Sequence, residues 1–400
     1  MAGITGLGTT FNLPNYTNEL YALTPDDTPL LSAIGGLTGG GQTTSTEFEW
    51  QTYDLRDPGQ RVKLEGADAP TAEERVRANV KNVVQIHQEK VSVSYTKQAA
   101  TGQLASPQSA PFNHPGGGPN PVTNEMDWQV AQALKSIALD VNWSFINGQY
   151  VLPTTNATAR QTKGLLAAIT TNRIAKGTTV TGLTSATDTI TSTGHGFVDG
   201  DKLVFTSAGT ASNIVPGRLY YVDQIDANSF KVSTSLGGTA ITLGTGTGIA
   251  YTKPWTTALT SDHVNDLIQL GYDNGGFSEQ TTATLLVNSI QKRAITKAYA
   301  SAYGQFQETS RNVGGVNVTT VTTDFGIFNI MSDRHMPQDT VVAVSLEQLM
   351  PVFLSIPGKG VMFEEPLAKT GSADNSQIYG EVGLKFGSEK AHAVMTGLKL

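Results

Sequence analysis

The sequence predicts an α+β protein that is interrupted by an inserted all-β segment, and three observations support this fold class. Apolar residues between positions 124 and 147 recur at spacings of three and four, which is the period of a long amphipathic helix. Short alternating strand patterns occupy residues 45–98 and the last third of the chain. Within residues 178–254, threonine and glycine rise, glutamate disappears, and strand patterns replace helical ones.

A chain of 400 residues is too long for one ordinary hydrophobic core, so two or three compact units are expected. Only 15% of the residues are charged, whereas 42 are glycine. This composition suits an ordered, β-rich protein with many tight turns. Because a surface with few charges is tolerable when neighbouring subunits cover it, we expect an oligomer.

Charge and cysteine content exclude several classes of protein. A net charge of -7 argues against a dedicated nucleic-acid binder, which needs clustered lysine and arginine. The absence of cysteine excludes disulfides, Cys-ligated zinc and thiol catalysis, and it suits a reducing cytoplasm. The first residues lack a basic start and an apolar h-region, and no window reaches the roughly 18 apolar residues of a membrane span. We therefore expect neither export nor membrane association.

Residues 1–44 are expected to form an N-terminal arm. Residues 1–20 show no hydrophobic period, as in an extended segment. Thr28 and Pro29 then open a short apolar helical turn, and the glycines between positions 35 and 41 end it. The extended part is either a frayed terminus or an arm that orders on a neighbouring subunit.

Residues 45–98 are expected to form a long hairpin. Phe48 and Trp50 alternate with polar residues on the outgoing strand, and the returning strand alternates in the same way. Residues 54–78 carry both charge signs and are too polar for a core, so they are predicted to be a projecting tip. The buried face of the returning strand is expected to switch near residues 87–90. The candidate assembly contacts on the tip are Arg56, Arg61, Lys63, Glu65, Arg75 and Arg77.

Residues 99–177 and 255–400 are expected to form the main core. After a loop rich in proline and glycine at residues 101–121, Asn124 is the predicted cap of a helix roughly 35 Å long. Helical patterns return after the inserted segment, where Ser261 is a predicted cap, and the final third alternates strands with a short helix. The residues expected on the buried face of the long helix are Met126, Val130, Leu134, Ile137, Val141 and Phe145.

Residues 178–254 are expected to form an independent β-sandwich or barrel. Asp199-Gly200 predicts a hairpin turn, and residues 226–229 separate two further strands. Helical patterns resume after residue 254 as though nothing had interrupted them. The strand candidates are residues 187–192, 202–207, 218–225, 229–233 and 240–243.

The sequence contains no recognisable catalytic or metal-binding constellation, so it predicts neither an enzyme nor a cofactor. The common nucleophile, phosphate-loop, zinc-protease and dinucleotide motifs are missing, and the six histidines have no metal-binding spacing. Asp199 and Asp201 flank a turn glycine, where aspartate is favoured for its backbone hydrogen bonds. Lys359, Glu364 and Glu365 have no histidine or serine partner and are interpreted as solvated loop charges.

Four sequence phrases, LTPDDTPLLSAIG, TEFEWQTYDL, TTDFGIFNIMSDRHMP and EEPLAKTGS, are similar to those of one branch of tailed-phage major capsid proteins. The order of parts resembles the Hong Kong 97 fold of that family, and the likeness covers most of residues 10–175 and 258–398. The resemblance implies an N-terminal arm, an extended loop at residues 45–98, a spine helix at residues 124–147, and peripheral and axial domains in the core. Residues 178–254 depart from the common pattern and resemble the small β domains that phage virion proteins carry as insertions.

The same resemblance implies a structural protein of the virion that self-assembles, as hexamers and pentamers, into an icosahedral head shell. The shell would enclose double-stranded DNA without sequence-specific binding. Portal and a separate scaffold or decoration protein are the implied partners, and the host cytoplasm is the implied place of assembly. Two alternatives stay open: another virion component, such as a tail-tube or baseplate protein, and a β-rich surface adhesin.

Overall fold

A computed structural model describes residues 26–56, 58–71, 73–98, 125–186, 188–277, 283–302, 319–369 and 371–400. The predicted arm up to residue 25, the loop at residues 101–121 and the predicted cap Asn124 lie outside these residues. The described chain divides into two units. One takes its described residues from 26–27, 88–139 and 362–379, and the other from 28–87, 140–361 and 380–400.

A six-stranded sheet forms the centre of the second unit. Two of its inner strands, β12 and β15, are buried along their whole length, because their Leu, Val and Ala side chains are covered on both faces. β12 pairs in parallel with β14 and antiparallel with β15. In spatial order the sheet contains β13 (Thr320–Thr323), β14 (Gly326–Ser332), β12 (Ala283–Val287), β15 (Val341–Ser345), β19 (Ala393–Thr396) and β5 (Arg173–Ala175).

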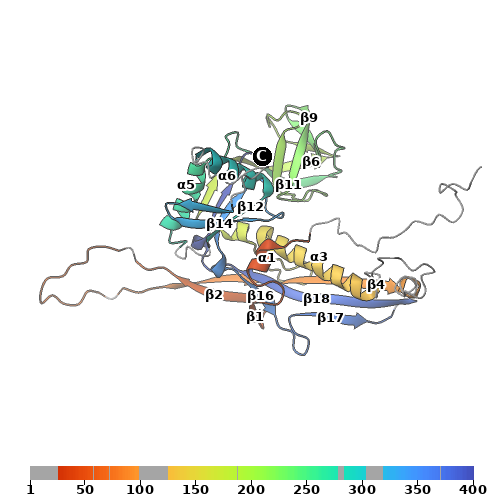
Figure 1. The fold of residues 1–400 in the computed structure, drawn as a ribbon, viewed down its shortest axis with the longest axis horizontal. Coiled ribbons are helices and arrows are strands. Elements are labelled where there is room, and N and C mark those ends of the chain that lie inside the picture. The colour runs from red at the N-terminus through yellow and green to blue at the C-terminus, as the bar shows by residue number, and fades with distance from the viewer. Residues whose placement is uncertain are drawn as a thin grey trace, which may run out of the picture. The chain divides into compact units, whose positions relative to one another are not determined.

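Two amphipathic helices, α5 (Ser261–Asp273) and α6 (Ser289–Ala302), pack on this sheet (Figure 1). Their apolar side chains join those of β12, β14, β15 and β19 in one core cluster. The predicted cap of α5 was one residue too late. Thr260 is the cap, because its hydroxyl accepts a hydrogen bond from the backbone N–H of His263 and the His263 side chain accepts one from the Thr260 N–H.

Six strands within the predicted insertion close into a barrel. Its interior is filled by aromatic side chains: Phe205, Phe230 and Tyr251 are fully buried, and the rings of both phenylalanines contact that of Tyr251. In spatial order the barrel contains β10 (Ser229–Ser233), β7 (Thr189–Thr191), β6 (Thr178–Ala186), β11 (Gly246–Lys253), β8 (Lys202–Ser207) and β9 (Leu219–Asp226).

The strand predictions for this barrel were partly wrong. Residues 240–243 contain only an isolated bridge at Ala240, whereas β6 and β11 were not among the predicted strands. Asp199-Gly200 does lie in a turn, in which the Asp201 N–H donates to the Val198 carbonyl over 3.0 Å. That turn does not join a hairpin, because β7 pairs with β6 and β10 while β8 pairs with β9 and β11.

The predicted hairpin is formed by β2 (Glu47–Tyr53) and β3 (Arg77–Val83), which pair antiparallel along all seven residues. The predicted switch of the buried face at residues 87–90 was wrong. It lies at Val83 and Val84, which are both buried and precede β4 (Gln85–Ser94). Within β4 the buried residues all keep odd positions, so this strand has no break of face.

The remaining strands form a further sheet, and the remaining helices include the longest one of the described chain. β1 (Gly41–Thr43), β16 (Met350–Leu354), β18 (Ala373–Lys385) and β17 (Met362–Leu367) follow one another in the sheet, and β4 pairs with β18. The long helix is α3 (Glu125–Asn147), and α1 (Pro29–Ala33) begins with proline at its first position as expected. Three short helices are α4 (Leu165–Ala168), η1 (Leu346–Gln348) and η2 (Glu389–Ala391).

Candidate assembly surfaces

The hairpin tip presents large apolar side chains to solvent. Leu64 is 85% exposed, and four further large apolar side chains on or beside the tip are more than half exposed: Tyr53, Leu55, Val62 and Val76. A single exposed leucine needs no explanation, but five such side chains on one short projection indicate a surface that another molecule covers. The tip therefore has the composition of an interface.

A single carboxylate, Glu73, organises the charges of the tip. Arg56, Arg61 and Arg75 each lie within 2.7–3.2 Å of a Glu73 carboxylate oxygen. Hydrogen bonds from Arg75 and then Arg56 hold the pKa of Glu73 below its usual range. Sequence reasoning named the arginines but missed Glu73, which is one acid in a long run of charges.

The other predicted contacts of the tip behave differently. Arg77 donates to the side-chain oxygen of Gln51 across the β2–β3 pair over 2.9 Å. Lys63 and Glu65 are exposed. Three of the six predicted contact residues thus bind one anion within their own tip, and whether any of the six binds a neighbouring subunit stays a prediction.

The long helix α3 buries a different stripe from the predicted one in its first half. Ile137, Val141 and Phe145 are buried, whereas Met126 and Val130 are only half-buried. Leu134, expected in the core, is 41% exposed, so that prediction was wrong. The buried residue at this turn is its neighbour Ala133, and a small side chain there allows closer packing.

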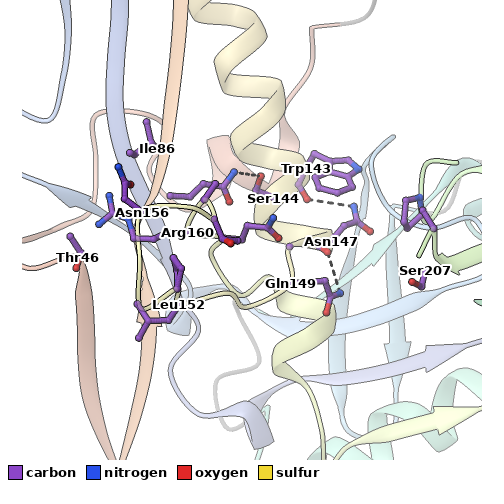
Figure 2. A pocket seen from close by; sticks show the side chains of 18 of the residues that line it. Thr46, Ile86, Trp143, Ser144, Asn147, Gln149, Leu152, Asn156, Arg160 and Ser207 are labelled. Carbon is purple, nitrogen blue, oxygen red and sulfur yellow. Dashed lines mark hydrogen bonds between the residues drawn. The ribbon is translucent and has the colours of Figure 1, made fainter. Parts of the chain in front are cut away.

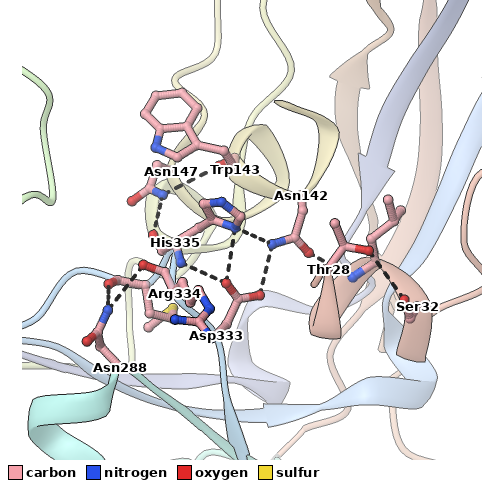
Figure 3. A network of polar contacts seen from close by, with 11 residues as sticks. Thr28, Ser32, Asn142, Trp143, Asn147, Asn288, Asp333, Arg334 and His335 are labelled. Carbon is pink, nitrogen blue, oxygen red and sulfur yellow. Dashed lines mark hydrogen bonds and ion pairs between the residues drawn. The ribbon is translucent and has the colours of Figure 1, made fainter. Parts of the chain in front are cut away.

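A buried polar network joins α3 to α1 and to the turn after β14 (Figure 3). The Asn142 side-chain oxygen accepts from the Leu31 N–H over 3.0 Å, and its nitrogen donates to Asp333 over 2.9 Å. His335 Nδ1 lies 2.9 Å from the same Asn142 nitrogen. Burial opposes ionisation of Asp333, but hydrogen bonds from His335 and Asn142 outweigh it and hold the pKa of Asp333 below its usual range.

Burial lowers the pKa of two buried histidines of the second unit, His87 and His392, to about 4. His392 Nδ1 faces the Ser345 N–H at 3.3 Å, and its Nε2 lies 3.0 Å from the Phe386 carbonyl oxygen. This geometry fits the neutral ring with its proton on Nε2. For His87, Nε2 has no hydrogen-bond partner among the described residues. Neither imidazole is placed to act as a catalytic base, since both are covered.

A cleft of about 920 Å³ lies among α3, the loop at residues 149–161 and the barrel (Figure 2). Its lining supplies amides and hydroxyls, such as Ser144 and Asn147, beside apolar groups such as Trp143. Among the described residues of the lining, Arg160 alone is charged, and it pairs with Glu381 over 2.7 Å. Such a lining can bind through hydrogen bonds, but it offers no acid and base pair for proton transfer.

The residues that sequence reasoning weighed for metal binding have structural roles. Asp199 accepts a hydrogen bond from the Gln224 N–H over 2.6 Å, and Asp201 accepts one from the Val198 N–H over 2.9 Å. His195 Nε2 lies 2.9 Å from the Asp226 carbonyl oxygen. In the described part of the chain, no group of three or more potential metal ligands occurs, and no helix has the length and apolarity to cross a membrane.

Comparisons with known proteins agree with the fold. The family model described as SU10 major capsid protein matches residues 3–399. The capsid asymmetric unit of cyanophage A-1(L) superposes with a TM-score of 0.57 at 12% identity, covering 99% of this chain and 100% of that one. The capsid of a native GTA particle gives a TM-score of 0.50 at 10% identity, with 98% of each chain covered.

A search among curated proteins found no match. The two structural likenesses concern the fold alone, because their sequence identities are low, and that fold is the Hong Kong 97-like capsid fold. The family match covers nearly the whole chain and decides against the tail-tube, baseplate and adhesin alternatives. This chain therefore belongs to the SU10 major capsid protein family, and it is a structural protein that forms the head shell of a phage.

Proposed function

We propose that copies of this chain assemble as hexamers and pentamers, and that the hairpin tip of each copy packs on a neighbouring subunit. The observation that carries this proposal is the set of large apolar side chains exposed on the tip. Full burial of one Leu or Val side chain contributes about 1.5–3 kcal/mol, whereas an exposed ion pair contributes about 0–1 kcal/mol. The apolar side chains, more than the arginines, are therefore expected to hold the tip on its neighbour.

Substitution of the two most exposed leucines of the tip tests this proposal. Leu55→Ser/Leu64→Ser should leave the subunit folded, because both side chains are exposed in the isolated chain. The concentration needed for shell formation should rise at least about tenfold, since burial of two leucines is lost. Electron microscopy and light scattering would measure assembly, and circular dichroism would measure the fold.

Exposed apolar residues of the barrel provide a matched control. Val198→Ser/Leu236→Ser also removes two exposed apolar side chains, which are 60% and 70% exposed. If the tip variant assembled at the same concentration as the wild type, the tip would have no part in shell formation. If both variants lost assembly equally, the effect would be one of general solubility, and the tip would again not be specific.

We further propose that the barrel is an independent domain on the outer surface of the shell. It has its own buried core, and its ends are adjacent, because Lys253 pairs with Thr178 in the β6–β11 ladder. Residues 178–254 carry four basic residues against five aspartates, so this domain is poorly suited to lie against packaged DNA.

Deletion of the barrel tests its independence. Cα atoms of paired strand residues lie about 4.5–5.5 Å apart, so a Gly/Ser linker of a few residues should replace Thr178 to Pro254 without strain. We expect the shortened chain to fold and to assemble. Limited proteolysis of intact wild-type particles should cut first within residues 178–254, whereas protection there would place the barrel inside or between subunits.

We also infer that portal and a separate scaffold or decoration protein are partners, that the shell encloses double-stranded DNA without sequence-specific binding, and that assembly takes place in the host cytoplasm. The net charge of -7 supports a lining that does not hold DNA tightly. Expression of this chain alone tests the need for a scaffold. Open sheets or aberrant shells would support a separate scaffold, whereas uniform closed shells would contradict it.

A further inference from the structure

Helices α5 and α6 lie on the same face of the six-stranded sheet. Each helix buries one side against the sheet and exposes the opposite side. Val264, Leu267 and Ile268 of α5 and Ile295 and Tyr299 of α6 are all buried in the core cluster of that face. The two helices also pack against each other. Their opposite sides form the outer layer of this part of the molecule.

The outward side of α5 carries a row of acidic and neutral polar residues at helical spacing. Asp262, Asp266, Gln269 and Asp273 follow one another at intervals of four, three and four residues, and all are exposed. This spacing places them in a single stripe along the helix. We call these residues the acidic stripe.

The outward side of α6 carries the opposite charge. Arg293 and Lys297 are exposed one turn apart, and the adjacent Lys292 is half-buried. The helix contains no acidic residue. We call these three residues the basic stripe. The charges of the two stripes, three negative and three positive, cancel when both are counted.

Within the described residues, the charges of these stripes are not paired with opposite charges. In the part of the chain that the structure describes, no ion pair involves any charged residue of either stripe. Like charges one turn apart, such as Asp262 with Asp266 or Arg293 with Lys297, destabilise a helix by roughly 0.2–0.5 kcal/mol per pair. An opposite charge that approaches from outside would relieve this repulsion within each stripe.

We propose that the acidic stripe of one copy faces the basic stripe of the next copy, in a head-to-tail interface. This inference rests on the proposed assembly into hexamers and pentamers, and it names the surfaces that form the rings. A head-to-tail contact closes into a ring when the rotation between copies divides a full turn, and each copy then uses α5 toward one neighbour and α6 toward the other. Tyr272, 52% exposed beside Asp273, adds an apolar contact at one end.

The charge balance favours a second copy over nucleic acid as the occupant. A DNA strand that reached the basic stripe would also meet three aspartates on the adjacent helix, and these repel phosphate. A second copy presents both signs in the complementary order. Electrostatic pairing of this kind selects the correct partner and orientation more than it adds affinity.

Charge reversal of each stripe tests the proposal. Asp266→Lys/Asp273→Lys and Arg293→Glu/Lys297→Glu should each raise the concentration needed for assembly about tenfold, because like charges then meet. The melting temperature of the unassembled subunit should change little, since all four side chains are exposed. Lys202→Glu/Lys231→Glu on the barrel matches the Arg293→Glu/Lys297→Glu variant in overall charge and should assemble as the wild type does. The variant with all four stripe substitutions should recover assembly, because complementarity returns with the signs exchanged.

Mixing the two double variants gives a sharper result. The first variant carries mostly positive charge on both stripes and the second mostly negative, so copies must alternate around a ring. Alternation closes only rings with an even number of members, so hexamers should form and pentamers should not. Electron microscopy of the mixture should show sheets or tubes without fivefold vertices.

The outcomes separate this inference from the proposed function. If the wild type forms no assemblies of any kind, neither shells nor sheets nor rings of five or six copies, the proposed assembly is wrong. If the wild type assembles, Leu55→Ser/Leu64→Ser fails, and both stripe reversals assemble normally, the proposed assembly stands and the pairing of stripes is wrong. If only the Arg293→Glu/Lys297→Glu variant fails and the four-site variant does not recover, the basic stripe binds another partner, such as nucleic acid, and the pairing is again overturned.

Discussion

Acidification should destabilise the unassembled subunit between about pH 6.5 and pH 4 because two histidines are buried without charge. Burial lowers the pKa of His87 and of His392 from the usual 6.5 to about 4. Protonation of His392 would add a proton to Nδ1, which already faces the Ser345 N–H. In His87 no partner near Nε2 would stabilise the charged ring. Both side chains therefore resist the charge that they accept readily in the unfolded chain.

The direction and size of this effect follow from the two pKa values. Between pH 6.5 and pH 4 the unfolded chain binds more protons than the folded one, so the free energy of unfolding falls as the pH falls. Above pH 6.5 neither histidine lowers the free energy of unfolding, because both are neutral in the folded and the unfolded chain. By pH 4 each histidine should have lowered the free energy of unfolding by about 3 kcal/mol, because one unit of pKa difference corresponds to about 1.4 kcal/mol. Near the middle of the range, the two histidines together should give a slope of about 2 kcal/mol per pH unit.

Urea unfolding of unassembled subunits, followed by tryptophan fluorescence at several pH values from about 5 to about 6.5, would measure this slope. Replacing each histidine in turn, as His87→Gln or His392→Gln, should remove about 1 kcal/mol per pH unit. Burial raises the pKa of Asp140 and of Asp339, which gives a slope of opposite sign. Those acids are present in all the variants, so the comparison isolates the histidines. An identical slope in the wild type and both variants would refute the reasoning.

Two further predictions concern packing. Ile137→Ala, which truncates a buried side chain of α3, should lower the free energy of unfolding by about 2–5 kcal/mol. Leu134→Ala should lower it by less than about half as much, because Leu134 is 41% exposed, and equal losses in chemical denaturation would contradict this difference. Gly177→Ala, directly before β6, should lower the free energy of unfolding by about 1–3 kcal/mol, because the added carbon would lie 2.5 Å from the Lys253 carbonyl oxygen. A variant with the wild-type melting temperature would show that the backbone there can shift to make room.

The sequence was sufficient where one strong pattern decided the structure. Val141 and Phe145 recur with a clean helical period, and both are buried in α3. The same period could not decide between positions 133 and 134, because 3.6 residues per turn counted back from Ile137 fall between them. Hydrophobicity favoured Leu134, yet the packing uses the smaller Ala133. A choice of this kind depends on the facing surface, which the pattern of one helix does not contain.

The polar parts of the candidate surfaces were harder to predict. Asn142 lies on the buried side of α3, and nothing local indicates that its partners are Leu31 and Asp333, which are 111 and 191 residues away. Glu73 was missed because nothing in the sequence distinguishes it from the other charged residues of the tip. Strand β11 was not predicted, because Gly246 and Gly248 break the alternation of its side chains, although both glycines lie in a paired strand. Long-range partners and glycine-rich strands thus account for most of the misses.

The closure of the barrel has a consequence for a protein that works at very high local concentration. Many identical copies form a phage head, and an open sheet with an unpaired outer strand would offer each neighbour a template for intermolecular pairing. Because β6 to β11 close on themselves, the backbone groups of these strands already have partners in the same copy. The strands of crowded barrels then offer no open edge to one another, so a threonine-rich β domain can be carried on every subunit without linking the particles into aggregates.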